Sequence, residues 1–298
     1  MKGWVYTGLI CALLLPLSAA FFPAFAESTI NTNNCWAWGA GSGWLNCRPD
    51  STNGVVVGEY VCSGWMYSPA VGWISLGDGT PTNGVQYTNN STNDYGVNHD
   101  GKGNLSGYAW GASAGWINFG WTNAGEPNAP TVDLKNGCLG GYAWGSSMGW
   151  VSLSNSTAYV QTDSLDSGAD DDGDGIPDSW EITKTGSTDL LGSGTSNYDG
   201  DLLTDYEEYV AGTCPTNPND YLMLADILGT GTNTIRLTWN SDGSRMYKIE
   251  TRSSLITGSW ANAGLFSPGT GSLTACIFSN AVTPELFYRL RAMLPLSE

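Results

Sequence analysis

Residues 108–119 read YAWGASAGWINF, and the same pattern returns three more times along the chain. The other copies are WAWGAGSGWLNC at 36–47, WMYSPAVGWISL at 65–76 and YAWGSSMGWVSL at 142–153. Each copy has an aromatic-x-aromatic segment, a five-residue turn that ends in Gly, and then Trp followed by an aliphatic residue. Two short strands around a glycine-containing turn are typical of a β-hairpin, so we predict four hairpins.

The aromatic positions predict the register of these hairpins. If each turn is centred on its third residue, the aromatic side chains form facing pairs: Trp38 with Trp44, Tyr67 with Trp73, Trp110 with Trp116, and Trp144 with Trp150. One such pair contributes roughly 0.2–1 kcal/mol, and an isolated hairpin is marginal in water, so the four hairpins must pack together. The closing Trp residues fall 29, 43 and 34 residues apart, which predicts variable loops between hairpins, the longest over 78–94.

Two interpretations of the Trp rings are open at this point. We expect the rings to form the stacked core of the repeat domain, because large aromatic side chains are usually well buried. The alternative is that some rings are exposed platforms for sugar rings, since Trp and Tyr have flat faces with polar tips. The candidate platform residues are Trp38, Trp44, Trp73, Trp110, Trp116, Trp144 and Trp150.

The amino terminus predicts export. Lys2 precedes an apolar run over 9–25 that ends in Ala24-Phe25-Ala26, so residues 1–26 are interpreted as a signal peptide. No later run of about 18 apolar residues predicts a membrane span. A net charge of −17 excludes the basic surface that a nucleic-acid partner requires. We therefore expect a secreted protein, extracellular or at the cell surface.

Cysteine usage agrees with export. Apart from Cys11 in the signal peptide, six cysteines remain, and an even number in an exported chain favours disulfides. Cys35 and Cys47 lie at equal distances from the turn centre at Gly41, so we predict that they face each other and form a disulfide. The pairing of the others stays open: Cys62, Cys138, Cys214 and Cys276.

Acidic residues crowd the segment 161–220, where Lys184 is the only basic residue. Residues 170–181 read DDDGDGIPDSWE and fit the twelve-residue calcium loop D-x-D-x-D-G-x5-E at every defining position. Alternate carboxylates can turn toward one centre, Gly175 allows the sharp bend, and the last Glu can reach back with both oxygens. The predicted ligands are Asp170, Asp172, Asp174, the carbonyl of Ile176, Asp178 (directly or through water) and Glu181.

A degraded second loop follows the first. Its predicted ligands are Asn197, Asp199, Asp201, Asp205 and Glu208. Leu202 stands where the bend-forming Gly is expected, so we expect a lower affinity or a different geometry. Short helices are predicted after the two loops, over 179–183 and 204–210.

Three resemblances accompany these patterns. The Trp-rich repeats over 34–160 are similar to GYAW…GWI repeats of other secreted bacterial proteins, which implies no particular function. The segment 163–221 resembles thrombospondin type 3 and dockerin-like calcium repeats, although Cys214 in CPTNPND stands where such repeats commonly have Asp. The segments LTWNSDGSRMYKIETRSSL (237–255) and FYRLRA (287–292) resemble fibronectin type III-like modules, and the resemblance implies a small β-sandwich.

We therefore expect a mostly β chain with a hairpin repeat domain over 27–160, a calcium-loop connector with two small helices over 161–220, and a β-sandwich over 221–298. No catalytic residues are expected, because His99, the only histidine, lies in a polar turn where we expect it to be solvated, and Glu59 has no recognisable partner. The predicted function is that of a calcium-binding structural and adhesive protein. The alternative is a carbohydrate-binding protein, whose partner would be an extracellular polysaccharide or another cell-surface component.

Overall fold

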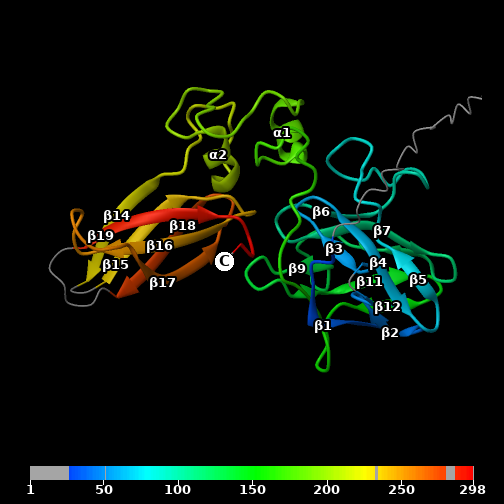
Figure 1. The fold of residues 1–298 in the computed structure, drawn as a ribbon. Helices are drawn as coiled ribbons and strands as arrows, with labels where there is room; N and C mark the ends of the chain where they lie inside the picture. The colour runs from blue at the N-terminus through cyan, green and yellow to red at the C-terminus, as the bar shows by residue number, and fades with distance from the viewer. Residues whose placement is uncertain (1–26, 51, 232–233, 280–285, 298) are drawn as a thin grey trace, which may run out of the picture.

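The computed structural model describes residues 27–50, 52–231, 234–279 and 286–297. Two β-rich parts lie on either side of a segment that carries two short helices, α1 (Asp178–Thr185) and α2 (Asp205–Ala211) (Figure 1). The chain is mostly β, as predicted. The predicted signal peptide, residues 1–26, lies outside the described residues. Within the described ranges, no helix is long and apolar enough to cross a membrane.

The first part contains the four predicted hairpins. They are β1 (Ile30–Gly39) with β2 (Gly43–Asn46), β4 (Cys62–Ser68) with β5 (Gly72–Ser75), β7 (Leu105–Gly111) with β8 (Gly115–Asn118), and β11 (Tyr142–Gly145) with β12 (Gly149–Ser152). Neighbouring hairpins pair edge to edge, and β12 returns to pair with β1, so the four hairpins form one closed sheet. The cross-strand register is the predicted one in all four: 38 faces 44, 67 faces 73, 110 faces 116 and 144 faces 150.

The glycine that ends each turn explains one constant position of the repeat. Gly43, Gly72, Gly115 and Gly149 have φ angles of 68°, 78°, 70° and 69°. This left-handed conformation costs little only for a residue without a side chain. Each of the four turns therefore depends on a glycine at the same position of the repeat.

The interior of the closed sheet corrects our expectation for the Trp rings. Small and aliphatic side chains fill it, none more than 3% exposed: Ala37, Leu45, Met66, Ile74, Ala109, Ile117, Ala143 and Val151. Successive side chains of a strand point to opposite faces, so the neighbouring aromatic rings lie outside. The exposed fractions of the seven candidate platform residues run from 39% for Trp110 to 45% for Trp150. The interpretation of the rings as the packed core is therefore wrong.

Shorter strands extend the first part. β3 (Val55–Val57) pairs with β4, β6 (Val97–His99) pairs with β7, and β9 (Thr131–Val132) pairs with β10 (Leu139–Gly140). β13 (Val160–Thr162) pairs with the first half of β1, and the carbonyl of Asp166 accepts a hydrogen bond from the Glu59 backbone at 2.9 Å. The first part therefore continues past 160, the boundary that we predicted.

His99 is buried, contrary to our expectation of a solvated turn residue. Its exposed fraction is 0%. Nδ1 donates to the carbonyl of Gly58 at 2.8 Å, and Nε2 accepts from the backbone of Gly103 at 3.0 Å. Both ring nitrogens are thus engaged with backbone groups, and burial lowers the pKa of the imidazole. The side chain joins two loops of the first part.

Cys35 and Cys47 lie opposite each other, as the hairpin register predicts. The backbone N–H of Cys47 donates to the carbonyl of Cys35 at 2.8 Å, and both side chains are buried. Both are free thiols in this structure, so their disulfide stays a prediction.

The carboxy-terminal part is the predicted β-sandwich. One sheet contains β14 (Leu224–Gly231), β15 (Thr234–Asn240) and β18 (Leu273–Ser279), and the other contains β17 (Ala261–Pro268), β16 (Met246–Arg252) and β19 (Phe287–Met293). Its buried core includes Leu237 and Trp239 from β15 and Tyr247 and Ile249 from β16. Side chains of both sheets therefore meet in one core.

Candidate metal centre

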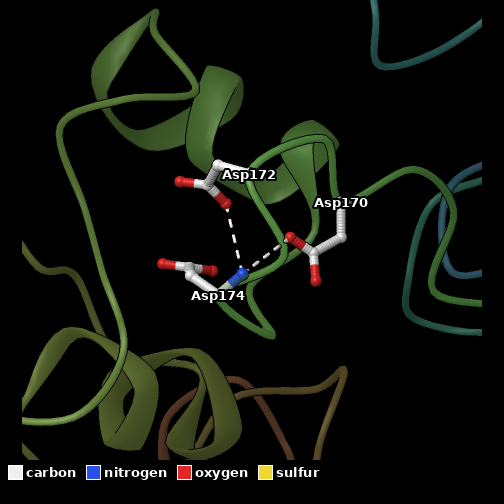
Figure 2. Close-up of side chains that lie close together, drawn as sticks. All are labelled: Asp170, Asp172 and Asp174. Atoms are coloured by element: carbon white, nitrogen blue, oxygen red, sulfur yellow. Dashed lines mark hydrogen bonds between the residues drawn. The ribbon is translucent and has the colours of Figure 1, made fainter.

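The first predicted calcium loop brings three carboxylates together. Oxygens of Asp170, Asp172 and Asp174 all lie within 4.8 Å of one another. Figure 2 shows them around one turn of the chain, with the backbone nitrogen of Asp174 between the carboxylates of the other two. Asp170 accepts backbone hydrogen bonds from Gly173 at 2.9 Å, from Asp174 at 3.1 Å and from Gly175 at 3.0 Å. The loop is therefore wrapped around its first residue.

Glu181, the last predicted ligand of this loop, lies in α1. Its exposed fraction is 0%, and neither side-chain oxygen has a hydrogen-bond partner. Burial, followed by the charges of Asp174 and Asp172, raises the pKa of Glu181 to about 7. A buried carboxylate without donors is costly, so this position needs a cation or a proton.

Asp178, predicted to bind the ion directly or through water, links the loop to the helix that follows it. It begins α1, and its Oδ1 accepts a hydrogen bond from the backbone of Asp171 at 3.0 Å. Ile176 has a fully buried side chain, which anchors the loop in the apolar core of the connector. We infer that Asp178 holds the loop in shape.

The second loop repeats this architecture 27 residues later. Oxygens of Asp199, Asp201 and Glu208 lie within 4.8 Å of one another. Asn197 accepts from the backbone of Gly200 at 2.7 Å, as Asp170 accepts from Gly173 in the first loop. The two loops are thus structural copies, although the sequence of the second is degraded.

Glu208 matches Glu181 in burial. Its exposed fraction is 0%, and its Oε2 has no hydrogen-bond partner, while Oε1 accepts from the hydroxyl of Thr213 at 3.2 Å. Burial, followed by the charge of Asp199, raises the pKa of Glu208 to about 8. One oxygen each of Asp199 and Asp201 is also buried without a partner.

The substitution at the bend changes the local geometry, as we expected. Gly175 has a φ angle of 92°, in the left-handed region. The φ angle of Leu202 is not positive. The Leu202 side chain is 81% exposed. The second loop therefore bends without a left-handed residue at this position and leaves an apolar side chain in solvent.

Asp205, a predicted ligand of the second loop, accepts hydrogen bonds from the loop itself. One of its oxygens accepts from the backbone of Tyr198 at 2.8 Å. The other accepts from the hydroxyl of Ser196 at 2.6 Å and from the backbone of Gly192 at 3.2 Å. Asp205 also lies outside the cluster that Asp199, Asp201 and Glu208 form, so its role as a ligand stays a prediction. Asp205 fixes the loop against the start of α2, as Asp178 does in the first copy.

The remaining donor sets fit a hard cation. The first loop offers carboxylates of Asp170, Asp172, Asp174 and Glu181, and the second offers Asn197, Asp199, Asp201 and Glu208. The backbone carbonyls of Ile176 and Leu203 stand at the equivalent seventh positions. Calcium takes six to eight oxygen ligands, whereas zinc and copper favour nitrogen or sulfur. The oxygen-only sets therefore fit calcium.

The two loops share one apolar core. Ile176, Trp180, Leu191 and Tyr209 pack together, and the rings of Trp180 and Tyr209 meet edge to face at 5.5 Å. Each loop thus depends on residues of the other, which couples the two candidate sites mechanically.

Tyr209 in α2 also touches both β-rich parts. Its hydroxyl donates to Glu59 of the first part at 2.7 Å. Its carbonyl accepts from Arg245 of the sandwich, at 3.0 Å from Nε and 2.7 Å from Nη2. The Arg245 guanidinium also lies 5.2 Å from the centre of the Tyr209 ring. Glu59 and Arg245 are only 7% and 4% exposed, so this contact is a buried junction.

Comparisons with known proteins do not place the chain in a family. No protein-family model matches the chain, and neither the curated proteins nor the solved structures give a match.

Sequence reasoning missed the junction. Glu59 had no recognisable partner along the chain because its partner Tyr209 lies 150 residues away. Near Tyr209 the sequence predicts only a short helix, and a helix by itself does not specify that its tyrosine contacts Glu59. The hydrogen bonds of Asp178 and Asp205 to the loop backbone were also missed, because the loop pattern specifies ligand positions and not the contacts that hold the loop.

Proposed function

We propose that this is a secreted or cell-surface structural and adhesive protein in which calcium makes the connector between two β modules rigid. The first loop would bind one ion through Asp170, Asp172, Asp174, Glu181 and the carbonyl of Ile176. The second would bind another through Asn197, Asp199, Asp201, Glu208 and the carbonyl of Leu203. Calcium supplies positive charge to buried oxygens that have no donor in the protein, which are both oxygens of Glu181 and one each of Asp174, Asp199, Asp201 and Glu208.

One observation carries this proposal. Glu208, whose buried Oε2 has no protein partner, is followed directly in α2 by Tyr209, which contacts both β modules. A cation that draws Glu208 toward Asp199 and Asp201 therefore fixes the helix that holds the junction. Loss of the cation leaves the Glu208 carboxylate of α2 close to the repelling carboxylates of Asp199 and Asp201 in the preceding loop. Calcium occupancy and the relative position of the modules are thus expected to be coupled.

Calorimetric titration of the purified mature chain with calcium tests the sites. We expect Glu181→Gln and Glu208→Gln each to remove one binding event, because the amide supplies only one neutral oxygen. Asp171→Asn is the matched control, since this exposed acid lies inside the first loop but outside the carboxylate cluster. Extracellular calcium modules bind at about 10⁻⁴ to 10⁻³ M, and magnesium should compete poorly because it demands a strict octahedron.

Small-angle scattering with calcium and with chelator tests the coupling. We expect a single compact arrangement with calcium and a broader distribution of dimensions without it. Tyr209→Phe should broaden the distribution even with calcium, because it removes the hydrogen bond to Glu59. Identical scattering curves in calcium and chelator would reject the connector function, and an absence of calcium binding in calorimetry would reject the sites.

Carbohydrate binding is a second candidate function, favoured by the outward Trp rings of the hairpins. Exposed aromatic faces in a row can stack on the apolar faces of sugars. A glycan array probed with and without calcium separates the two functions. Glycan binding that survives chelation would assign it to the hairpin sheet alone, whereas binding that needs calcium would tie it to the connector.

A further inference from the structure

The outer face of the third hairpin carries an open cleft of about 450 Å³. It lies beside β7 and β8 and is lined by Asn89, Asn90, Ser91, Thr92, Tyr95, Tyr108 and Trp116. One wall is aromatic, and the other is a polar loop. None of these lining residues carries a charge at neutral pH.

The aromatic wall consists of three rings. Trp116 meets Tyr95 edge to face at 5.1 Å and Tyr108 at 6.1 Å. Tyr108 and Trp116 are 37% and 41% exposed. The edge-to-face contacts fix the ring orientations while part of each ring stays accessible to a ligand.

The polar wall is held in place by its own hydrogen bonds. Asp94 is 5% exposed, and its carboxylate accepts from the backbone N–H groups of Thr82 at 3.1 Å and Thr88 at 3.0 Å. Asn89 has a φ angle of 56°, and its side chain accepts from the backbone of Gly96 at 3.1 Å. A loop that is already ordered loses little entropy when it binds a ligand. The exposed side chains of Asn90 and Thr92 are thus presented on a fixed frame.

The cleft is built by the longest insertion of the repeat. The closing Trp residues of the second and third hairpins are 43 residues apart, against 29 and 34 for the other intervals. Long ordered loops in compact domains are commonly functional, because a structureless loop of that length is otherwise costly. The extra residues serve the third hairpin in this case, because they form the wall that faces Trp116.

We propose that this cleft binds a neutral saccharide unit of a polysaccharide, an inference that rests on the second candidate function above. Flat rings match the apolar face of a sugar, and amide and hydroxyl groups match its hydroxyls. The uncharged lining offers no partner to a charged ligand, and the net charge of −17 disfavours acidic polysaccharides. A pocket of this size falls within the usual range for small ligands.

Calorimetry and Trp fluorescence test this with four probes: cellohexaose, mannohexaose, hexa-N-acetylchitohexaose and a hyaluronan hexasaccharide as the acidic comparison. We expect at least one neutral probe to bind, and the acidic one to bind less. Trp116→Ala should weaken that binding about tenfold, because the central ring of the wall is lost. Asn90→Ala should weaken it severalfold. Tyr198→Ala is the control, since Tyr198 is 52% exposed in the connector and does not line the cleft, so it should leave affinity unchanged. Trp44→Ala tests the alternative of a site on the first hairpin, because Trp44 is 40% exposed beside Trp38 and lies outside the cleft.

The outcomes distinguish a failure of the cleft proposal from a failure of carbohydrate binding as a function of the hairpins. Binding that survives Trp116→Ala and Asn90→Ala but is lost in Trp44→Ala overturns the cleft and leaves carbohydrate binding at another hairpin. Absence of binding to every neutral probe overturns both. A proline-rich peptide is a fifth probe, because such peptides also dock on aromatic grooves; tighter binding of this peptide than of any neutral saccharide overturns the saccharide assignment. If Trp116→Ala does not fold, Asn90→Ala and Thr92→Ala decide, because both change exposed loop positions.

Discussion

The closed hairpin sheet and the acidic connector are both built from internal repeats, but they bury opposite kinds of side chain. The sheet encloses aliphatic groups such as Ile74 and Ile117, which need no partner. The connector encloses the carboxylates of Glu181 and Glu208, with oxygens that find no donor in the protein. Repetition therefore produces a self-sufficient module in one case and, as we propose, an ion-dependent module in the other.

This difference has a thermodynamic consequence. Apolar burial stabilises the sheet in any buffer. Buried carboxylates stabilise the connector only when a cation offsets their repulsion. Substitutions in the sheet should therefore act independently of calcium, and substitutions in the connector should act through it.

The largest effect is expected for Ile117→Ala inside the sheet. Ile117 is 1% exposed, and truncation of a buried Ile to Ala costs about 2–5 kcal/mol. Chemical denaturation followed by Trp fluorescence should show this loss equally in calcium and in chelator. A loss that appears only in chelator would contradict the separation of the two modules.

Calcium removal should have the next largest effect. At ten times the dissociation constant, one site adds about 1.4 kcal/mol to the free energy of unfolding, provided that it is absent from the unfolded chain. Chelator should thus lower the melting temperature and expose the connector to protease. Asp174→Asn should reproduce part of this loss in calcium, and Asp171→Asn should not. Equal melting temperatures with and without calcium would show that calcium does not stabilise the connector.

Acid should destabilise the first part through His99. Burial holds the pKa of the folded imidazole below its ordinary value of 6.5. Well above pH 6.5 the imidazole is neutral in both the folded and the unfolded state, and its contribution to the free energy of unfolding is fully present. As the pH falls through 6.5 toward the lower pKa of the folded state, only the unfolded state gains a proton, so this contribution is lost.

The control for this prediction is His99→Asn. The Asn amide can still donate to Gly58, so the variant should fold, with a lower overall stability. The difference in unfolding free energy between wild type and variant cancels the carboxylates that both contain. This difference should shrink as the pH falls from 7 to 5, and a constant difference would be inconsistent with a buried neutral imidazole.

A smaller effect than that of Ile117→Ala is expected for Trp116→Ala, the residue next to Ile117 on the opposite face. Its ring is 41% exposed and meets Tyr95 and Tyr108 edge to face. Loss of such contacts costs about 0.5–1.5 kcal/mol each, below the 3–5 kcal/mol of a buried Trp. Melting curves of Trp116→Ala and Ile117→Ala compared side by side measure which face of β8 is the core. A larger loss for Trp116→Ala would reverse the assignment.

The sequence by itself determined the local features of this protein. Aromatic spacing predicted the hairpin register, since facing residues lie at equal distances from the turn centre, as Trp38 and Trp44 do. Acid spacing predicted the two clusters, since alternate residues of a short loop converge on one point, as Asp170 and Asp172 do. Both features depend only on residues within a few positions of one another.

Tertiary structure alone decided which face of the hairpins is buried and how the modules meet. Both faces of each hairpin carry apolar side chains, so alternation could not tell Trp116 from Ile117. Closure of the sheet by the pairing of β12 with β1 settled it, because the enclosed space admits small and aliphatic groups and leaves the indole rings outside. The contact of Glu59 with Tyr209 likewise joins residues 150 positions apart, and no local pattern encodes a pair at that distance.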